Sequence, residues 1–380
     1  MAGRLLSGPA AGFLAGGIYA IAGIGPHIEG YTFNGELAAA VPATAAVVAA
    51  LVARRHDSRR WLVGAAALGG SAMLMKQSGF DGLAVVFAVA LLGRERLKST
   101  ALVVGGAAVP LGASAIAGWL SGWRFYWSAV VGDHLAAATS ALRARHLLGS
   151  LPAAAHDLLP LAATAVVGLW FLRKRPFQLQ MGLVWLAAAV AGVNVGGMYW
   201  PHYYVQVLAP LCVLAALALA AIPSRVVAWA AAGVIALPAL LFLGGLVDVS
   251  DFRSDRMIKY ALGYENDQRI ARYVRSHSSP HASVYALVSR ADFYFLADRR
   301  AAFPYLWARP LDTIPGARAS LARTLAARKR PRFVVLFQRG PLHRLEKGLL
   351  PILKRDYRAV WRAPGTGTTV LAAEKHRALG

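Results

Sequence analysis

Residues 37–76 read LAAAVPATAAVVAALVARRHDSRRWLVGAAALGGSAMLMK, in which two apolar runs flank a loop with four arginines. Apolar runs of this kind cross a bilayer as helices, and short loops rich in Arg and Lys stay on its cytoplasmic side. The same alternation continues in both directions along the chain. We therefore predict an α-helical polytopic membrane protein with about nine spans between Leu5 and Val247.

The predicted spans follow the apolar runs: residues 5–24, 37–53, 61–76, 79–93, 101–120, 152–172, 178–197, 204–222 and 226–247. The third and fourth are shorter than the ~20 residues that usually cross a bilayer, and they meet at residues 76–79. They form either two spans with a tight turn or one long broken helix. Basic loops at both ends of the pair require an even number of crossings, which favours two spans. A cleaved signal peptide is the less favoured alternative for the first span, because Arg4 is its single preceding cation.

Basic and acidic residues are concentrated on opposite sides of the predicted membrane. Twelve of the sixteen Lys and Arg residues at positions 1–247 lie at the N-terminus or in the even-numbered loops. Five of the seven acidic residues there lie in the odd-numbered loops: Glu29, Glu36, Asp81, Asp133 and Asp157. The positive-inside rule then places the N-terminus in the cytoplasm and the odd-numbered loops outside, as expected in a plasma membrane. We expect any chemistry on the external face.

The composition agrees with a membrane protein, since 57% of the residues are hydrophobic. The formal net charge of +23 reflects the basic loops and a basic C-terminal region, so we predict no nucleic-acid partner.

Cys212 is the single cysteine, which excludes an internal disulfide. The sequence has no Walker-type loop and no paired CxxC motif, so it gives no support to an ATP-driven pump or a structural zinc site.

Residues 248–380 have a charged and mixed composition and are numerous enough for a small domain. Helical and strand patterns alternate along this region: helices at 266–276, 291–297, 321–329 and 342–353, strands at 282–288 and 333–337, and a closing hairpin at 357–361 and 368–372. This alternation predicts a C-terminal α/β domain. Nine spans after a cytoplasmic N-terminus make it extracytoplasmic, and the transmembrane domain is residues 1–247.

The acidic residues of the external face are candidates for catalysis, because ionisable groups at membrane depth are costly and mark function. Glu36 opens the second span and is a catalytic candidate, although it is also placed to cap the helix and meet its dipole. Glu29 is the second catalytic candidate. Together with His27 it could move a proton or bind a divalent metal, but two groups in one loop are a small ligand set.

Basic side chains on the same face are candidates for binding a phosphate headgroup. Lys76 supplies a point charge and Gln77 a neighbouring amide, although Lys76 is also placed to snorkel to the membrane surface. Arg124 offers a planar fork for a phosphate. Arg124 lies near the start of the external loop 121–150. The pattern at 135–148 in this loop predicts a helix lying along the membrane surface. Asp133 and His134 in that loop form an acid–base pair only if folding brings both to one acceptor.

Residues 198–210 read MYWPHYYVQVLAP and enter the eighth span from the external side. The rings can stack on a sugar, and the His and Gln can bind its hydroxyls. An aromatic belt at the membrane interface is the alternative for Trp and Tyr alone. The substrate-binding candidates here are Trp200, His202, Tyr203, Tyr204 and Gln206.

This segment, extended through residues 211–221, resembles the late external loop and helix of polytopic glycosyltransferases with the type C fold, especially protein O-mannosyltransferases and aminoarabinose lipid A transferases. Other landmarks follow in the same order. Residues 30–53 resemble the family's helix that begins with an acidic motif, residues 75–79 its Lys-Gln break, and the tail its extracytoplasmic domain. The family's first spans and the acidic loop between them have no counterpart here, so no residue matches that loop's catalytic Asp.

The resemblance implies an integral membrane glycosyltransferase that transfers a sugar from a polyprenyl-phosphate-linked donor to a cell-envelope acceptor at the external face. A carboxylate would assist the acceptor hydroxyl, and cations would stabilise the departing lipid phosphate. Its partners would be the lipid-linked sugar, membrane lipid and the acceptor. One alternative is a non-catalytic protein that binds the lipid-linked glycan. A transporter is a further alternative, but it would place ionisable residues in the middle of several spans.

Overall fold

The computed structural model describes residues 1–132, 140–247, 264–287, 290–306, 310–311, 314–337, 344–363 and 367–374. By its internal contacts the chain divides into two compact units, Met1–Asp248 and Val249–Gly380. The first unit is helical, and the second contains a five-stranded sheet.

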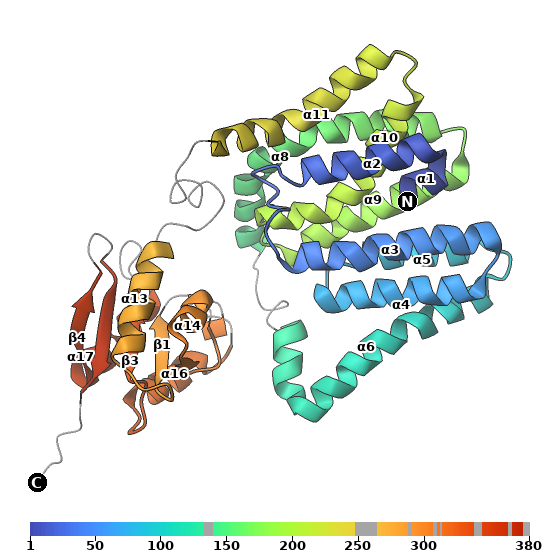
Figure 1. Ribbon diagram of the computed structural model, residues 1–380. Helices are drawn as coiled ribbons and strands as arrows, with labels where there is room; N and C mark the ends of the chain where they lie inside the picture. The colour runs from blue at the N-terminus through green and yellow to red at the C-terminus, as the bar shows by residue number, and fades with distance from the viewer. Residues whose placement is uncertain are drawn as a thin grey trace, which may run out of the picture. The chain divides into compact units, whose positions relative to one another are not determined.

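Helices occupy all nine positions at which the sequence predicts spans, and they lie alongside one another (Figure 1). They are α1 (Ala2–Ser7) with α2 (Pro9–Ala22), α3 (Gly35–His56), α4 (Arg59–Met75), α5 (Asp81–Leu91), α6 (Arg96–Trp127), α8 (Ser140–Leu172), α9 (Pro176–Gly196), α10 (Val205–Ala221) and α11 (Arg225–Leu246). Among the described residues, six helical segments are long and apolar enough to cross a membrane: those of α3, α6, α8, α9, α10 with the short helix η2 (Pro201–Tyr204), and α11. The prediction of a polytopic membrane fold is confirmed.

The helices α4 and α5 fold back on each other instead of forming one long broken helix. A Cβ added to Gly69 of α4 would lie 2.9 Å from the Cβ of Leu83 of α5, so the two helices are in close contact. The preceding residue of α5, Gly82, approaches α3, where a Cβ on Gly82 would lie 2.4 Å from the carbonyl oxygen of Ala43. Small residues allow this close packing of membrane helices. With 11 residues, α5 extends only about 17 Å, less than the thickness of a hydrocarbon core.

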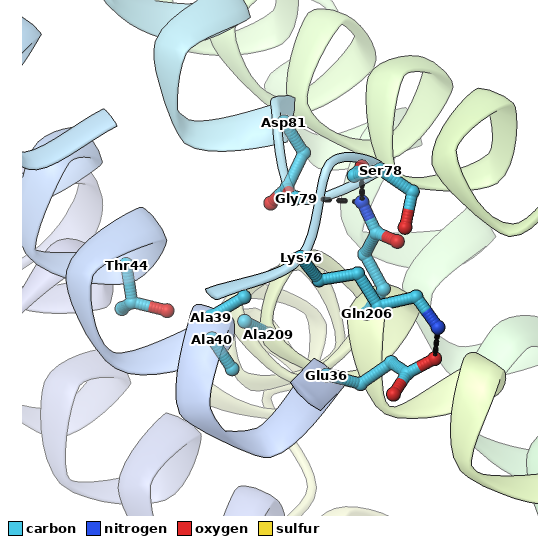
Figure 2. A pocket seen from close by; sticks show the side chains of 10 residues that line it. All are labelled: Glu36, Ala39, Ala40, Thr44, Lys76, Ser78, Gly79, Asp81, Gln206 and Ala209. Atoms are coloured by element: carbon cyan, nitrogen blue, oxygen red, sulfur yellow. Dashed lines mark hydrogen bonds and ion pairs between the residues drawn. The ribbon is translucent and has the colours of Figure 1, made fainter. Parts of the chain in front are cut away.

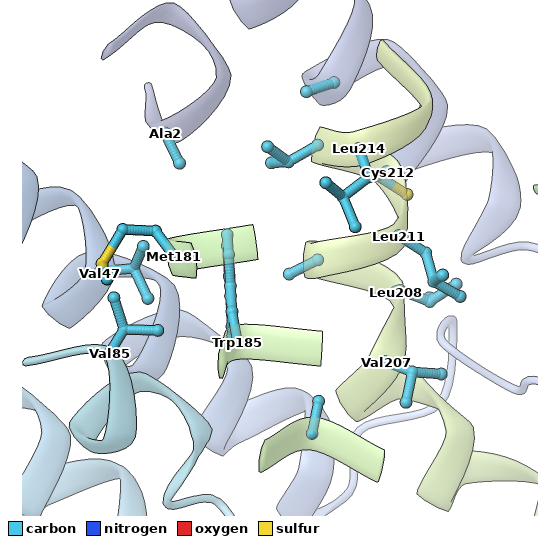
Figure 3. Packing of buried hydrophobic residues seen from close by; sticks show 14 of the residues in the cluster. Ala2, Val47, Val85, Met181, Trp185, Val207, Leu208, Leu211, Cys212 and Leu214 are labelled. Carbon is cyan, nitrogen blue, oxygen red and sulfur yellow. The ribbon is translucent and has the colours of Figure 1, made fainter. Parts of the chain in front are cut away.

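The helix α10 forms the centre of the first unit. Fifteen of its seventeen residues are buried, whereas only three of the 22 residues of α11 are. Twelve of these buried residues belong to one apolar cluster with Met181 and Trp185 of α9 (Figure 3). Much of the surface of α11 is apolar and exposed, as expected for a helix that faces lipid.

The helix boundaries differ from the prediction at one place. The pattern at 135–148 predicted a helix lying along the membrane surface; residues 135–139 lie outside the described residues, and residues 140–148 begin the 33-residue helix α8, Ser140–Leu172, which runs on into the predicted span. That the first turns of α8 lie along the membrane surface stays a prediction. The internal prolines of α8, Pro152 and Pro160, do not end it, because a proline removes a single backbone hydrogen bond and neighbouring turns continue. The span before it also continues, through a kink at Gly122 (φ 118°), to Trp127.

The predicted basic loops lie together at one end of the bundle (Figure 1). Arg59 donates to Glu95 at 2.6 Å, which joins the loops before α4 and α6. The guanidinium of Arg54 lies 5.6 Å from the ring centroid of Phe177, at the start of α9. Arg175, just before α9, lies 3.5 Å from the hydroxyl of Ser7. The alternation of loops seen in the sequence therefore corresponds to two ends of the folded bundle.

The second unit is an α/β fold, as predicted. Its helices and strands are α13 (Tyr264–Ser276), β1 (Ser283–Leu287), α14 (Ala291–Ala297), β2 (Arg300–Ala301), α16 (Ala317–Ala326), β3 (Phe333–Leu336), α17 (Arg344–Asp356), β4 (Tyr357–Arg362) and β5 (Thr369–Ala373). The strand order is β2-β1-β3-β5-β4, with β1 parallel to β2 and β3, and β5 antiparallel to β3 and β4. Alternate strand residues contribute to two cores, one with α13 and α14 and the other with α16 and α17.

The close contact between α8 and α10 gives a stability prediction. A Cβ on Gly168 would lie 2.0 Å from the carbonyl oxygen of Leu214, so Gly168→Ala should force the helices apart and destabilise the protein by about 1–3 kcal/mol. The matched control is Gly105→Ala in α6, which meets no atom within 4 Å. Thermal unfolding of both variants in the same detergent measures the difference. Equal melting temperatures would show that α8 and α10 do not pack in this way.

Candidate functional site

Three of the four odd-numbered loops meet at the end of the bundle opposite the basic loops. They are the segment between α2 and α3, the break between α4 and α5, and the connection from α9 to α10. Contacts join all three: Glu36 pairs with Lys76, Glu29 with His202, and Asp81 with Gln206. These pairs are far apart in the sequence, so the fold brings them together.

Glu36 and Lys76 form an ion pair (Figure 2). Glu36 lies in the first turn of α3 and is only 4% exposed. The cap of that helix is Asn34, whose side chain accepts a hydrogen bond from the backbone N–H of Leu37 at 2.9 Å. The carboxylate of Glu36 therefore has Lys76 as its partner and does not serve as the cap, the alternative that the sequence left open.

Lys76 also contacts an aromatic ring. Its Nζ lies 3.6 Å from the ring centroid of Tyr203, a distance typical of a cation–π interaction. The side chain is 18% exposed, so it points into the protein and does not snorkel away from it. This position places one cation between a buried carboxylate and a ring from the α9–α10 connection.

Asp81, at the start of α5, is fully engaged by two neighbouring helices. Gln206 of α10 donates from Nε2 to Asp81 Oδ1 at 3.1 Å and to the carbonyl oxygen of Ser78 at 2.6 Å. Trp185 of α9 donates to Asp81 Oδ2 at 2.9 Å. Gly192 leaves the space for this amide, because a Cβ there would lie 2.2 Å from Gln206 Nε2. The network holds the break between α4 and α5 against α9 and α10.

A pocket lies between α3, the break and α10 (Figure 2). Its volume is about 310 Å³ including the adjoining solvent. The lining combines one cation, two carboxylates and an amide with small side chains: Glu36, Ala39, Ala40, Thr44, Lys76, Ser78, Gly79, Asp81, Gln206 and Ala209. The site therefore presents a cation, two carboxylates and an amide beside a wall of small apolar side chains.

Glu29 connects to this site through a series of contacts. It adopts a left-handed backbone conformation (φ 54°), is 8% exposed, and its Oε2 lies 3.3 Å from Nδ1 of His202. The His202 ring packs edge-on against the Tyr203 ring, with centroids 5.4 Å apart. Tyr203 in turn lies beneath Lys76. Both predicted carboxylates therefore belong to one connected group of side chains, although Glu29 is not part of the pocket lining.

Tyr31 reports on the environment of the segment before α3. Partial burial raises its pKa to about 12, and the negative charges of Glu29 and Asp157 contribute in the same direction. The phenol therefore stays protonated at neutral pH. Its ring stacks on that of Phe242 of α11, with centroids 5.5 Å apart.

His27 does not pair with Glu29 as the metal hypothesis required. Its Nδ1 lies 3.1 Å from Asp157 Oδ1, and its backbone N–H donates to Asp157 Oδ2 at 2.8 Å. Nδ1 of His156 lies 3.0 Å from the same Oδ1. The partners come from α8, more than a hundred residues away in the sequence, which is why a local pattern did not indicate them.

Other predicted site residues lie elsewhere among the described residues. Gln77 and Arg124 are exposed, and neither is among the residues that line the pocket. Trp200 is 44% exposed and its ring lies 6.4 Å from that of His146. Tyr204 is buried, with its hydroxyl 3.0 Å from that of Ser150. Asp133 and His134 lie outside the described residues.

Asp81 is the residue that sequence reasoning missed. It appeared only as one of five external acids, without a role. A signal was present, because an acid that opens an apolar helix must find partners to be buried. Its actual partners, Trp185 and Gln206, are more than a hundred residues away.

Comparisons with known proteins bear on the fold. No family model matches the sequence, and no curated protein matches it. Among solved structures, the chain is similar to ArnT from Cupriavidus metallidurans bound to undecaprenyl phosphate, with a TM-score of 0.63 and 16% sequence identity. The match covers 98% of this chain and 80% of that chain. This likeness confirms the predicted fold, a multi-pass helical membrane fold like that of the type C glycosyltransferases.

Proposed function

We propose that this protein is an integral membrane glycosyltransferase. It takes a sugar from a polyprenyl-phosphate-linked donor and transfers it to a cell-envelope acceptor at the external face of the plasma membrane. The observation that carries the proposal is the position of Lys76, paired with Glu36 and lining a pocket between apolar helices. The fold supports it, because ArnT, an aminoarabinose lipid A transferase, was solved with undecaprenyl phosphate bound.

The pocket suits the phosphate end of such a donor. Lys76 supplies a compact positive charge, which is how lysine commonly binds a phosphate. The wall formed by Ala39, Ala40 and Ala209 offers no competing polar group to the first carbons of the lipid. The pocket is lined from α3 and α10, which are both apolar enough to cross a membrane, so the polyprenyl chain can remain in the hydrocarbon while its phosphate reaches Lys76.

The transfer step requires one bond to form and one to break. The acceptor hydroxyl oxygen forms a bond to the anomeric carbon, and the bond from that carbon to the phosphate oxygen breaks with its electron pair. Negative charge then grows on the lipid phosphate, where Lys76 stabilises it. The hydroxyl proton passes to a carboxylate, and Glu36 is the acid in the pocket that is not already held by two side-chain donors.

Glu29 has a positioning role in this proposal. It is not in the pocket lining, but it lies beside His202, which packs against the Tyr203 ring beneath Lys76. The pair of Glu29 and His202 therefore fixes the ring on which the ammonium group of Lys76 rests. Loss of Glu29 should weaken donor binding more than it slows the chemical step.

The orientation can be tested with single-cysteine variants, because the native Cys212 is buried. Gln77→Cys places an exposed thiol at the pocket end, and Lys98→Cys places one at the basic end. A membrane-impermeant maleimide added to intact cells should label Gln77→Cys and should reach Lys98→Cys only after permeabilisation. The reverse pattern would put the pocket on the cytoplasmic side and would contradict an external reaction.

Direct binding tests the donor class. The purified protein in nanodiscs should bind undecaprenyl phosphate in preference to the same polyprenol without phosphate, and Lys98→Ala should bind as the wild type does. Equal affinity for the alcohol and the phosphate would remove the central role of Lys76. Binding of the phosphate without any transfer from glycosylated donors would favour the non-catalytic binding protein.

A further inference from the structure

A second cluster of side chains lies outside the pocket, where the segment before α3 meets α8. It consists of His27, His156 and Asp157, whose ligand atoms all lie within 4.8 Å of one another. We infer that these three residues form a binding site for a divalent transition-metal cation of the Zn²⁺ class, one that fastens the segment before α3 to α8. The inference does not rest on the proposed transfer reaction.

The distances within the cluster fit shared ligation. Both imidazole Nδ1 atoms face one oxygen, Asp157 Oδ1, at 3.1 Å for His27 and 3.0 Å for His156. Zinc bonds to nitrogen and oxygen are about 2.0–2.1 Å long, so neighbouring ligands in a tetrahedral site lie about 3.3 Å apart. The two distances to Asp157 Oδ1 are already close to this value, and all three ligand atoms lie within 4.8 Å of one another, so a cation entering between them would draw the two imidazole nitrogens together by up to about 1.5 Å.

The carboxylate is already oriented for this role. The side chain of Asp157 is 2% exposed, and its second oxygen, Oδ2, accepts the backbone N–H of His27 at 2.8 Å. Hydrogen bonds of this kind commonly orient ligating carboxylates. Gly25 permits the approach, because a Cβ there would lie 2.6 Å from Oδ2. One oxygen is therefore fixed by the backbone and the other is directed at the two histidines.

The histidines leave a route for the cation. The side chains of His27 and His156 are 41% and 63% exposed, so a metal can enter from solvent and keep water as a fourth ligand. Two imidazoles and a carboxylate are the ligand types that zinc uses when one position stays open. This donor set disfavours Mg²⁺ and Ca²⁺, which prefer oxygen ligands.

The site has a structural consequence for the rest of the molecule. His27 lies two residues before Glu29, whose carboxylate contacts His202. A metal that joins His27 to α8 would restrain this segment and with it the left-handed conformation at Glu29. Binding should therefore raise the melting temperature of the full-length protein by a few degrees at saturating metal.

The test is metal binding by the full-length protein in nanodiscs after removal of metal with a chelator. We expect titration with Zn²⁺ to show one strong site per chain, and Co²⁺ to give the visible absorption of a four-coordinate ion. Loss of a residue that only hydrogen-bonds to a metal ligand commonly costs about 10–100-fold in affinity, so loss of the ligand His156 in His156→Ala should weaken Zn²⁺ binding by at least about 100-fold. His156 is largely exposed, so this variant should fold normally.

A histidine beside an aspartate at the other end of the bundle provides the control. His56→Ala, next to Asp57, should leave Zn²⁺ affinity and the Co²⁺ spectrum unchanged, and His27→Ala should repeat the loss seen with His156→Ala. The inference is overturned if wild type binds no more Zn²⁺ than His156→Ala. It is equally overturned if His56→Ala weakens binding as much. Sugar transfer need not be measured, so the result does not depend on the proposed function.

Discussion

Replacing Lys76 with alanine should lower the rate of sugar transfer by at least about 100-fold, comparable to the loss of one group that stabilises transition-state charge. Lys76 is the cation among the described residues that line the pocket, so its ammonium group is placed to neutralise the phosphate as the glycosidic bond breaks. Donor binding should weaken as well, because the ground-state phosphate is also charged. The measurement is release of polyprenyl phosphate from a labelled donor, with affinity determined separately.

The single variant also breaks a buried ion pair. Removing one partner of such a pair commonly costs about 3–5 kcal/mol, because the remaining charge is left uncompensated. The double variant Lys76→Met with Glu36→Gln removes both charges and should recover stability without recovering transfer. Lys98→Ala, at the opposite end and 72% exposed, is the matched lysine control. Full transfer by a folded double variant would show that Lys76 has no part in the reaction.

Replacing Glu36 with glutamine should reduce the turnover number by about 10²–10⁴-fold and leave donor affinity equal to or tighter than that of the wild type. The amide keeps the size and a hydrogen-bond acceptor for Lys76, but it cannot take the proton of the acceptor hydroxyl. Affinity should not fall, because Lys76 no longer has an anionic neighbour that competes with the phosphate. Turnover and affinity should therefore separate in this variant, whereas both fall in Lys76→Ala.

The control for Glu36 is Glu95→Gln, which removes a carboxylate at the basic end, where Glu95 pairs with Arg59 and Lys98. Its turnover should match that of the wild type. Unchanged turnover in Glu36→Gln would reject this residue as the base. Glu29→Gln would then be the variant to measure, because Glu29 is the other predicted carboxylate in the same connected group.

The membrane fold was predictable because it depends on local composition. Apolar runs fixed the positions of the nine helices, and cations in alternate loops indicated which loops share an end of the bundle. The lengths of the helices were less predictable, since α8 continues through two prolines and α5 has only 11 residues. Hydrophobicity indicates that a segment is buried or in lipid, but packing against neighbours decides where it ends.

The site was predictable only in part, because its pairings are long-range. Glu36 and Lys76 were both selected from the sequence, but the contact between them depends on how α4 packs against α3. Gln77 follows Lys76 directly and is nevertheless exposed, since adjacent residues at the break point in different directions. Gln206 was expected to meet a sugar, yet its amide is bonded to Asp81 and Ser78. Residue type indicated the region, and only the fold gave the partners.

The most direct test of the central claim is an assay of the purified wild-type protein in nanodiscs with labelled polyprenyl-phosphate-linked sugars and cell-envelope acceptor extracts. The account predicts release of polyprenyl phosphate together with label in the acceptor, and the loss of both in Lys76→Ala. Wild-type protein that binds the donors without releasing polyprenyl phosphate from any of them would contradict it, as would release that is equally fast in Lys76→Ala.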